Sequence, residues 1–387
     1  MIFITKRSLI TVFGLMFLLP GLFYVSWMKA VSVMAPGKLE GPPIMIEVAV
    51  ELTGPVAPWG QAAMKGVKMA VEEANQIGKN GRPFEITTVD ANDTTGLSGI
   101  PEQVQKNAAV AVLGPITPSK AEALLKAGLT VPLISLSTNP SIPALGEKVL
   151  QGTYNDEQQG TAAAQYVVKS GYRQALMVTE EKSAYAQSLA QAFQKACEGQ
   201  GATIVKEISY KRGQQDFGAI LTEIQKEKAD LIYLPGYAKE ARAFLQQARQ
   251  KGIETPIIGG DGLESAAKEL ANKEKTGESW RLLYTTPNFI PTGQADEFIQ
   301  VYQKRYNEYP QPMALWAYEA TRGLINALST PIVQRDPSKL MQQMAISSWP
   351  VTGGRMRIDG ERHALRPMAI MKLDSELRLV EVIPPNQ

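Results

Sequence analysis

The stretch VPLISLSTNP, residues 131–140, is the point from which the fold can be argued outward. Val131, Leu133 and Ile134 form a short apolar run, which predicts a buried strand of a parallel sheet covered on both faces. Hydroxyl and amide side chains follow at once, and Pro140 ends the strand. Ligands of open α/β sheets bind outside the carboxyl ends of the strands, so these side chains are candidates for holding a small anion such as a carboxylate. Taken alone, these residues are better explained by a hydroxyl-rich turn that caps the next helix, at residues 141–145.

The composition excludes several classes of function. The chain has 387 residues, enough for two ordinary domains, and a hydrophobic content of 44% that supports full cores. Its formal net charge is +2 and no basic stripe is visible, so nucleic acid binding is not predicted. A single cysteine, Cys197, and a single histidine, His363, exclude an intrachain disulfide and a metal site with several histidines. The phosphate-binding motifs GxGxxG and GxxxxGK[ST] and the nucleophile motif GxSxG do not occur.

The amino terminus predicts an export signal or a membrane anchor. Lys6 and Arg7 precede residues 8–28, an apolar run without a charged residue. This run is longer than the usual core of a signal peptide and could span a bilayer, whereas Pro20-Gly21 in its middle is better tolerated in a cleaved signal. Both alternatives predict export of the remaining chain. Residues 37–43, GKLEGPP, then indicate a linker.

After this linker, short apolar runs alternate with amphipathic segments, which is the pattern of repeated βαβ units. One series covers residues 44–135 and a second covers 157–258. Between them, QGTYND at 151–156 is predicted to be a crossing strand or a linker. LTGPVAPWG, residues 52–60, is predicted to be a loop. The last part of the chain is predicted to contain helices over 294–306 and 313–327 and three short strands between 355 and 383.

Four predicted strand ends carry residues that suit a ligand site. They are the loop with Trp59, the segment GPITPS at 114–119, the opening stretch, and a group made of Tyr185, Tyr237 and Asp261. Taken singly, each has a structural explanation as a packing, capping or turn residue. Together they suit a small zwitterion, because hydroxyl and N–H groups can hold a carboxylate, an acid can hold an ammonium group, and aromatic rings exclude water.

At these residues a family resemblance becomes clear. From about residue 46 to about 382, the chain resembles the type I periplasmic solute-binding proteins, in the branch that includes the leucine/isoleucine/valine-binding proteins of ABC importers. The resemblance is carried by several motifs together: LTGPVAPWGQAAMKGVKMAVEEAN at 52–75, VLGPITPS at 112–119, VPLISLSTNP at 131–140, DLIYLPGY at 230–237, IIGGDG at 257–262 and AYEATRGL at 317–324.

The resemblance implies an α/β fold of two doubly wound, Rossmann-like lobes joined by three crossing strands. The crossings are expected near Thr153, Thr286 and Leu365. The implied division of the chain is a signal or anchor with its linker at 1–43, a first lobe of 44–153 with 287–364, and a second lobe of 154–286 with 365–387.

The resemblance also implies the ligand residues. A carboxylate is expected at Thr117 or Ser119 and at Ser137 with Thr138. An ammonium group is expected at Asp261. Aromatic walls are expected at Trp59, Tyr185 and Tyr237, with Trp316 or Tyr318 as further candidates. Three departures are visible: Pro118 stands where the family has a serine, LISLSTNP at 133–140 is one residue shorter than the common form, and ANDTTGLSGIPEQVQ at 91–105 is unusual for the family.

We therefore interpret the chain as an exported solute-binding protein and not an enzyme. It is expected to bind a small amino acid or a related carboxylate by hinge closure and to dock on an ABC permease in the inner membrane. A monomer in the periplasm is predicted, without a cofactor, a metal or a nucleic acid partner. The alternative is a membrane-tethered sensory domain of the same fold, held by residues 8–28.

Overall fold

The structure is a computed structural model that describes residues 39–385 except 79–80, 274–279, 289 and 291–292. The predicted signal or anchor at residues 8–28 lies outside the described residues. Within the described part of the chain, no helix combines the length and the apolar character that crossing a membrane requires.

The first body is built on a five-stranded parallel sheet in the order β2-β1-β3-β4-β5. Its strands are β1 (Ile44–Val50), β2 (Phe84–Asp90), β3 (Ala111–Leu113), β4 (Leu133–Ser135) and β5 (Val149–Gln151). The connections contain α2 (Ala57–Ile77), α3 (Thr94–Asn107), α4 (Pro118–Lys126) and the 3-10 helix η1 (Ile142–Leu145). Every residue of β3 and β4 is buried, as the apolar run at the start of the opening stretch predicts.

The second body is built on a seven-stranded sheet in the order β15-β14-β10-β9-β8-β6-β7. Its strands are β6 (Gln174–Glu180), β7 (Thr203–Tyr210), β8 (Leu231–Tyr233), β9 (Ile257–Gly259), β10 (Leu282–Thr286), β14 (Met368–Leu373) and β15 (Leu377–Ile383). β14 and β15 are antiparallel to their neighbours, and the other pairs are parallel. The helices of this body are α5 (Asp156–Lys169), α6 (Ala184–Glu198), α7 (Gly218–Ile224), α8 (Ala238–Gln250), the 3-10 helix η2 (Asp261–Leu263) and α9 (Glu264–Lys273).

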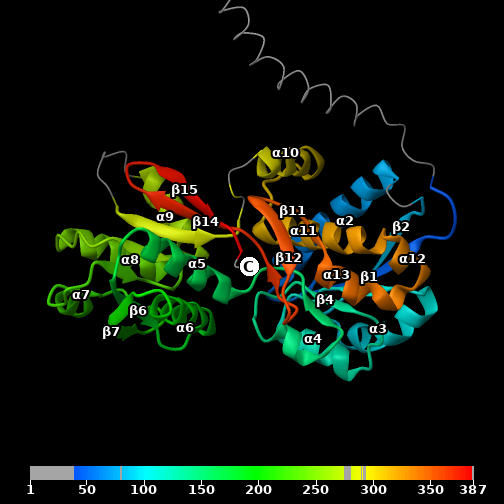
Figure 1. The fold of residues 1–387 in the computed structure, drawn as a ribbon, viewed down its shortest axis with the longest axis horizontal. Helices are drawn as coiled ribbons and strands as arrows, with labels where there is room; N and C mark the ends of the chain where they lie inside the picture. The colour runs from blue at the N-terminus through cyan, green and yellow to red at the C-terminus, as the bar shows by residue number, and fades with distance from the viewer. Residues whose placement is uncertain (1–38, 79–80, 274–279, 289, 291–292, 386–387) are drawn as a thin grey trace, which may run out of the picture.

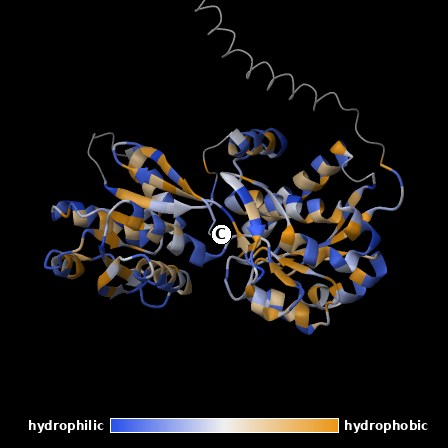
Figure 2. Ribbon diagram, viewed as in Figure 1, coloured by the Kyte–Doolittle hydropathy of each residue, from blue (hydrophilic) through white to orange (hydrophobic). Residues whose placement is uncertain are grey.

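The remaining elements return to the first body. They are α10 (Gly293–Tyr306), α11 (Pro312–Leu328), α12 (Pro331–Arg335), η3 (Pro337–Lys339), α13 (Leu340–Ile346), and a small sheet of β11 (Ser348–Val351), β12 (Gly354–Ile358) and β13 (Ala364–Leu365). Figure 1 shows the two bodies side by side, with α11, α12 and α13 beside β1 and β4, and with β14 and β15 beside α9. In Figure 2 hydrophobic residues gather on the strands inside each body.

The chain thus passes between the bodies three times, after β5, after β10, and between β13 and β14. This confirms the predicted α/β fold of two doubly wound bodies joined by crossing strands. Gly252, which follows α8, has the positive φ of 67° expected of a residue that ends a helix.

The chain crosses between the bodies at residues 152–155, within the segment predicted to cross, between Gln151 at the end of β5 and Asp156 at the start of α5. Two predictions of local structure were wrong. Residues 52–60 are only partly a loop, because α2 begins at Ala57 with a proline in its first turn, which places Trp59 inside the helix. The segment between 354 and 383 forms four strands rather than three. Short strands bounded by turns were the hardest elements to count, because two or three residues carry little periodicity.

A buried ion pair fixes the third crossing. Arg366 Nη1 lies 2.8 Å from Glu319 Oε2, and both side chains are almost fully buried. Thr352 connects them, since its N–H donates to Glu319 at 2.7 Å and its hydroxyl accepts from Arg366 Nη2 at 3.0 Å. Gln158 on α5 donates to the carbonyl of Ala364 at 2.6 Å and accepts from the Arg366 N–H at 3.2 Å. This crossing is therefore bonded to both bodies, which is consistent with a pivot.

Helices α2 and α11 pack backbone against backbone at one glycine. A Cβ atom added to Gly66 of α2 would lie 2.0 Å from the carbonyl oxygen of Ala314 and 3.0 Å from the N–H nitrogen of Tyr318, both in α11. Such distances are far below van der Waals contact, so no side chain fits without separating the helices. This close approach holds the later helices on the first sheet.

We predict that Gly66→Ala lowers the free energy of unfolding by about 1–3 kcal/mol, because the added methyl group overpacks this contact. The matched control is Gly99→Ala in α3, where an added Cβ meets nothing within 4 Å. That control is expected to raise stability by about 0.5–1 kcal/mol, since alanine is the better helix former. Urea denaturation measures both, and equal stability of the two variants would contradict the packing argument.

Candidate functional site

A cavity of about 480 Å³ lies between the two bodies and takes residues from both. The first body lines it with Trp59, Ile116, Thr117, Pro118, Leu136, Ser137, Thr138, Asn139, Gln311, Pro312, Met313 and Trp316. The second body and the first two crossings line it with Tyr154, Asp156, Tyr185, Tyr237, Asp261, Gly262 and Asn288.

All the ligand residues predicted from the sequence line this cavity, with one exception. Ser119 is exposed on the second residue of α4 and is not among the lining residues. Of the two further aromatic candidates, Trp316 lines the cavity, whereas Tyr318 lies elsewhere and donates its hydroxyl to Glu73. The structure therefore brings the predicted residues together, apart from Ser119 and Tyr318.

Asp261 is the most fully bonded side chain of the cavity. Its Oδ1 accepts from the Tyr185 hydroxyl at 2.7 Å and from Gln159 Nε2 at 3.0 Å, and its Oδ2 accepts from the Tyr154 hydroxyl at 3.0 Å. Burial raises the pKa of Asp261, and the hydrogen bonds from Tyr185, Gln159 and Tyr154 oppose this rise. The result is a buried carboxylate held in one orientation by donors from three elements.

Glycines are required around this carboxylate because other chain segments approach its backbone. A Cβ on Gly262 would lie 2.1 Å from the carbonyl oxygen of Gly236, and one on Gly260 would lie 2.4 Å from Leu189 Cδ2 and 2.6 Å from the Tyr185 hydroxyl. The sequence GGDG thus allows β9 to deliver Asp261 between α6 and the turn after β8. Its glycines serve close packing as well as the turn.

Asp156 is a second carboxylate of the cavity, and the sequence analysis did not select it. It is the first residue of α5, after the cap residue Asn155, whose Oδ1 accepts from the Gln158 N–H at 3.1 Å. Burial, and next the charge of Asp261, raise the pKa of Asp156 to about 7, while a hydrogen bond from Thr138 lowers it. An acid in the first turn of a helix is common, so the residue pattern does not indicate a ligand role for Asp156.

Aromatic rings form much of the remaining wall. Tyr185 and Tyr237 stack with their centroids 5.1 Å apart and their planes at 27°. Tyr154 and Trp316 meet edge to face at 5.0 Å. Trp59 and Tyr237 are 54% and 41% exposed, so one side of the cavity is open to solvent. A solute that entered would cover these exposed rings.

The opening stretch forms a hydrogen-bonded turn that borders the cavity. Ser135 donates its hydroxyl to the carbonyl of Pro115 at 2.9 Å and accepts from the Ser137 N–H at 3.3 Å. Asn139 accepts from the N–H and the hydroxyl of Ser141 at 2.9 and 2.7 Å, which organises the turn. Ser137, Thr138 and Asn139 nevertheless line the cavity. The turn is therefore internally bonded and also forms part of the wall.

Glu51 occupies the donors of the neighbouring strand end. Its carboxylate accepts from the N–H of Ile116 at 3.1 Å, from the N–H of Thr117 at 3.0 Å and from the Thr117 hydroxyl at 2.6 Å. The Glu51 side chain is fully buried. Both donors of Thr117 are therefore engaged within the protein, a feature that the sequence analysis missed because Glu51 follows an ordinary apolar strand.

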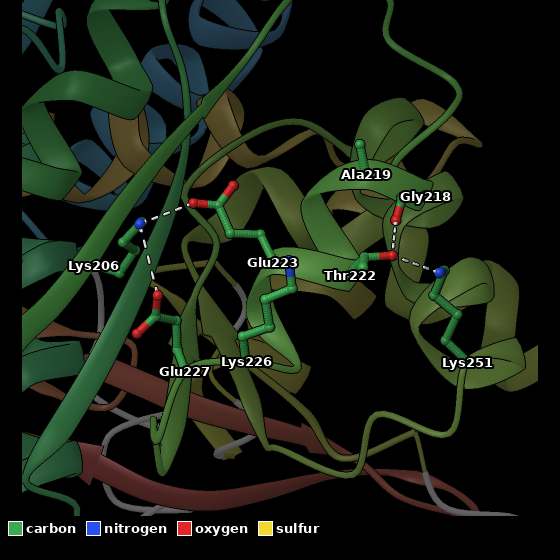
Figure 3. Close-up of a pocket in the computed structure, with 8 residues that line it drawn as sticks. All are labelled: Lys206, Gly218, Ala219, Thr222, Glu223, Lys226, Glu227 and Lys251. Carbon is green, nitrogen blue, oxygen red and sulfur yellow. Dashed lines mark hydrogen bonds and ion pairs between the residues drawn. The ribbon is translucent and has the colours of Figure 1, made fainter.

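A larger hollow of about 680 Å³ lies on the outer surface of the second body, between β7 and α7 (Figure 3). Lys206 Nζ lies 2.9 Å from Glu223 and 3.6 Å from Glu227, while Lys251 donates to the Thr222 hydroxyl at 2.9 Å. Three lysines and two glutamates line the hollow, and no aromatic ring does. We therefore place the candidate site in the cavity between the bodies.

Comparisons with known proteins show the family of the chain. The model of the family described as "Periplasmic binding protein" matches residues 43–377. The chain belongs to the periplasmic binding protein family. This periplasmic binding protein is 26% identical over 293 residues to the leucine-specific-binding protein of Salmonella typhimurium, which covers 74% of this chain and 79% of that protein.

Solved structures share the fold of this periplasmic binding protein. The branched-chain amino acid transporter substrate binding protein LivJ from Streptococcus pneumoniae, in complex with isoleucine, is 27% identical with a TM-score of 0.63, covering 89% of this chain and 100% of that one. An ABC transporter solute binding protein from R. palustris, in complex with benzoate, is 20% identical with a TM-score of 0.62, covering 89% and 97%. The relatives are solute-binding proteins and not enzymes, and this chain is likewise a binding protein.

The raised pKa of Asp156 gives a prediction for stability. The folded protein retains a proton on Asp156 between pH values of about 4 and about 7, where the unfolded chain has released it. Stability from this group is therefore lost as the pH rises through that window, by at most about 1.4 kcal/mol per pH unit. We expect the melting temperature of the wild type to fall more between pH 5 and pH 8 than that of Asp156→Asn. If the melting temperatures of the two proteins change with pH in parallel, the pKa of Asp156 is not raised by folding.

Proposed function

We propose that this protein is the exported substrate-binding component of an ABC importer and that it binds a small amino acid or a related solute between its lobes. The observation that carries the proposal is the cavity lined by both bodies, with the oriented carboxylate of Asp261 in its wall. A carboxylate in a partly water-excluded site forms strong, charge-assisted bonds with an ammonium group. The family and the named relatives support the transport role.

We infer that the solute is captured by hinge closure. In this proposal the lobes are residues 44–153 with 287–364 and residues 154–286 with 365–387, and they rotate about the three crossings as rigid bodies. A solute bonded to Asp261 touches Trp59 of the other lobe fully only when the lobes approach. This differential contact would shift the population toward the closed form, which then docks on the permease. One chain supplies both walls of the cavity, which is compatible with a monomer.

Asp261→Asn tests the ammonium site. A thermal-shift screen of amino acids, amines and small carboxylates first identifies a binder, because binding raises the melting temperature by mass action. For an amine-bearing binder, calorimetry is expected to show a loss of affinity of about 10- to 100-fold in Asp261→Asn, the usual worth of a hydrogen bond to a charged group. The matched control is Glu223→Gln in the outer hollow, where affinity is expected to stay constant. If Asp261→Asn and Glu223→Gln bind the amine with equal affinity, Asp261 does not bind the ammonium group.

A second candidate function is a membrane-tethered sensor with the same lobes. The observation in its favour is the charge-free run at residues 8–28, which is long enough to span a bilayer. Intact-mass measurement of the mature protein decides between the two. We expect a mass that lacks these residues if the protein is released into the periplasm. A retained amino-terminal segment in the membrane fraction would favour the tethered form.

A further inference from the structure

We propose that the solute of this cavity is an organic cation, an amine without a neighbouring carboxylate, bound by Asp156 and Asp261 between the aromatic rings. This inference rests on the proposed function and names the class of solute that the same site accepts. It departs from the expectation from the sequence, which was an amino acid or a related carboxylate. Four observations support it.

The first observation is the charge of the wall. Among the described residues that line the cavity, the charged side chains are Asp156 and Asp261, and no lysine, arginine or histidine is present. The Arg212 guanidinium lies 5.9 Å from the ring centroid of Tyr237, one of the aromatic wall residues. Its charge is already paired with Glu180 at 2.8 Å. Carboxylates removed from water are stabilised by an opposite charge, so this wall favours a cation and opposes an anion.

The second observation is that the place expected for a ligand carboxylate is already filled. The N–H groups of Ile116 and Thr117 and the Thr117 hydroxyl all donate to the buried carboxylate of Glu51. Pro118, which follows and also lines the cavity, has no N–H to offer. A solute carboxylate at Thr117 would therefore face the lone pairs of the Thr117 hydroxyl oxygen. The Glu51 carboxylate, bonded to that hydroxyl, would repel it. Glu51 takes the bonds that a zwitterion would need.

The third observation concerns the remaining hydroxyl groups of the first body. Thr138 hydrogen-bonds to Asp156, so its hydroxyl also serves a carboxylate of the protein. Ser119, the other residue expected to hold a carboxylate, is exposed and does not line the cavity. Of the expected carboxylate partners that line the cavity, one remains. The described contacts show the Ser137 hydroxyl accepting from the Asn139 N–H, but they show no acceptor for its own hydrogen. A single neutral hydroxyl cannot offset two facing carboxylates.

The fourth observation is a pair of unsatisfied polar atoms in the wall. Asn288 and Trp316 are each 8% exposed, and Asn288 Oδ1 and Trp316 Nε1 have no hydrogen-bond partner. Buried polar atoms are normally bonded, so these two suit groups of a solute. Asn288 Oδ1 can accept a further N–H, and the Trp59 and Tyr237 rings suit a cation on their faces. The Trp316 N–H can donate to an oxygen elsewhere in the solute.

A matched panel of solutes tests the proposal on the wild-type protein. Each carbon skeleton is supplied in three forms, for example 3-methylbutylamine, leucine and 4-methylpentanoate, together with the corresponding phenylethyl and butyl series. Thermal shift and calorimetry at pH 7.5 are expected to show binding of amines at least about tenfold tighter than of the matched amino acids, a difference of about 1.4 kcal/mol. No binding of the carboxylates is expected.

The outcomes separate this proposal from the proposed function. Tighter binding of an amino acid or a carboxylate than of its matched amine would overturn the cation proposal and leave a solute-binding protein. Absence of binding by every member of the panel to the folded protein would count against the proposed function itself.

A variant locates the cause of the preference. Glu51→Gln removes the buried charge behind Thr117 and is expected to reduce the amine-to-amino-acid affinity ratio by about tenfold, the effect of one like charge a few ångströms away. The matched control is Glu47→Gln, which changes a buried glutamate within β1 that bonds to Thr87 and does not line the cavity. An unchanged ratio in a folded Glu51→Gln protein would show that Glu51 does not exclude carboxylates.

Discussion

The structure depends on one buried carboxylate that must be satisfied from several directions. Asp261 accepts hydrogen bonds from Tyr154 on the first crossing, from Gln159 on α5 and from Tyr185 on α6. The same groups bond to the backbone of η2, since Gln159 accepts from the Asp261 N–H at 2.8 Å and Tyr185 accepts from the Gly262 N–H at 3.0 Å. An unsatisfied carboxylate there would be costly, so these elements are held in a single arrangement. The second body therefore presents a preformed binding wall.

The two bodies contribute unequally to the cavity. The second body supplies the negative charge of Asp156 and Asp261 and the stacked pair of tyrosines. The first body supplies apolar surface, including Trp59 and Met313, and a turn whose hydroxyl groups are largely used within the protein. In the proposed mechanism, a solute would bind first to the charged wall and would then be covered by the apolar one. This order follows from the fact that electrostatic contacts act over a longer range than apolar packing.

Much of the fold could be predicted from the sequence because its elements are periodic and bounded by glycine and proline. The buried strands, the long helices and the strand ends with Tyr237 and Asp261 all follow from these patterns. The start of α2 was misplaced because a proline that opens a helix resembles a proline in a loop. Glu51 and Asp156 were missed for a different reason. Their roles arise from contacts with residues distant in the chain, and neither residue type is unusual where it stands.

The predicted carboxylate site shows the same limit. Hydroxyl residues at the ends of β3 and β4 suggested an anion, and the structure places a carboxylate among these donors. That carboxylate belongs to the protein itself. Sequence patterns identified donors suited to an anion, but only the three-dimensional contacts show which anion occupies them.

The most direct test of the account is a crystal structure with the tightest-binding solute of the matched panel. The account predicts that the solute nitrogen lies within hydrogen-bond distance of the Asp261 carboxylate, with Trp59 and Tyr237 closed over it from opposite lobes. A solute bound at the outer hollow around Lys206, or bound in the cavity with its nitrogen directed away from both aspartates, would contradict it.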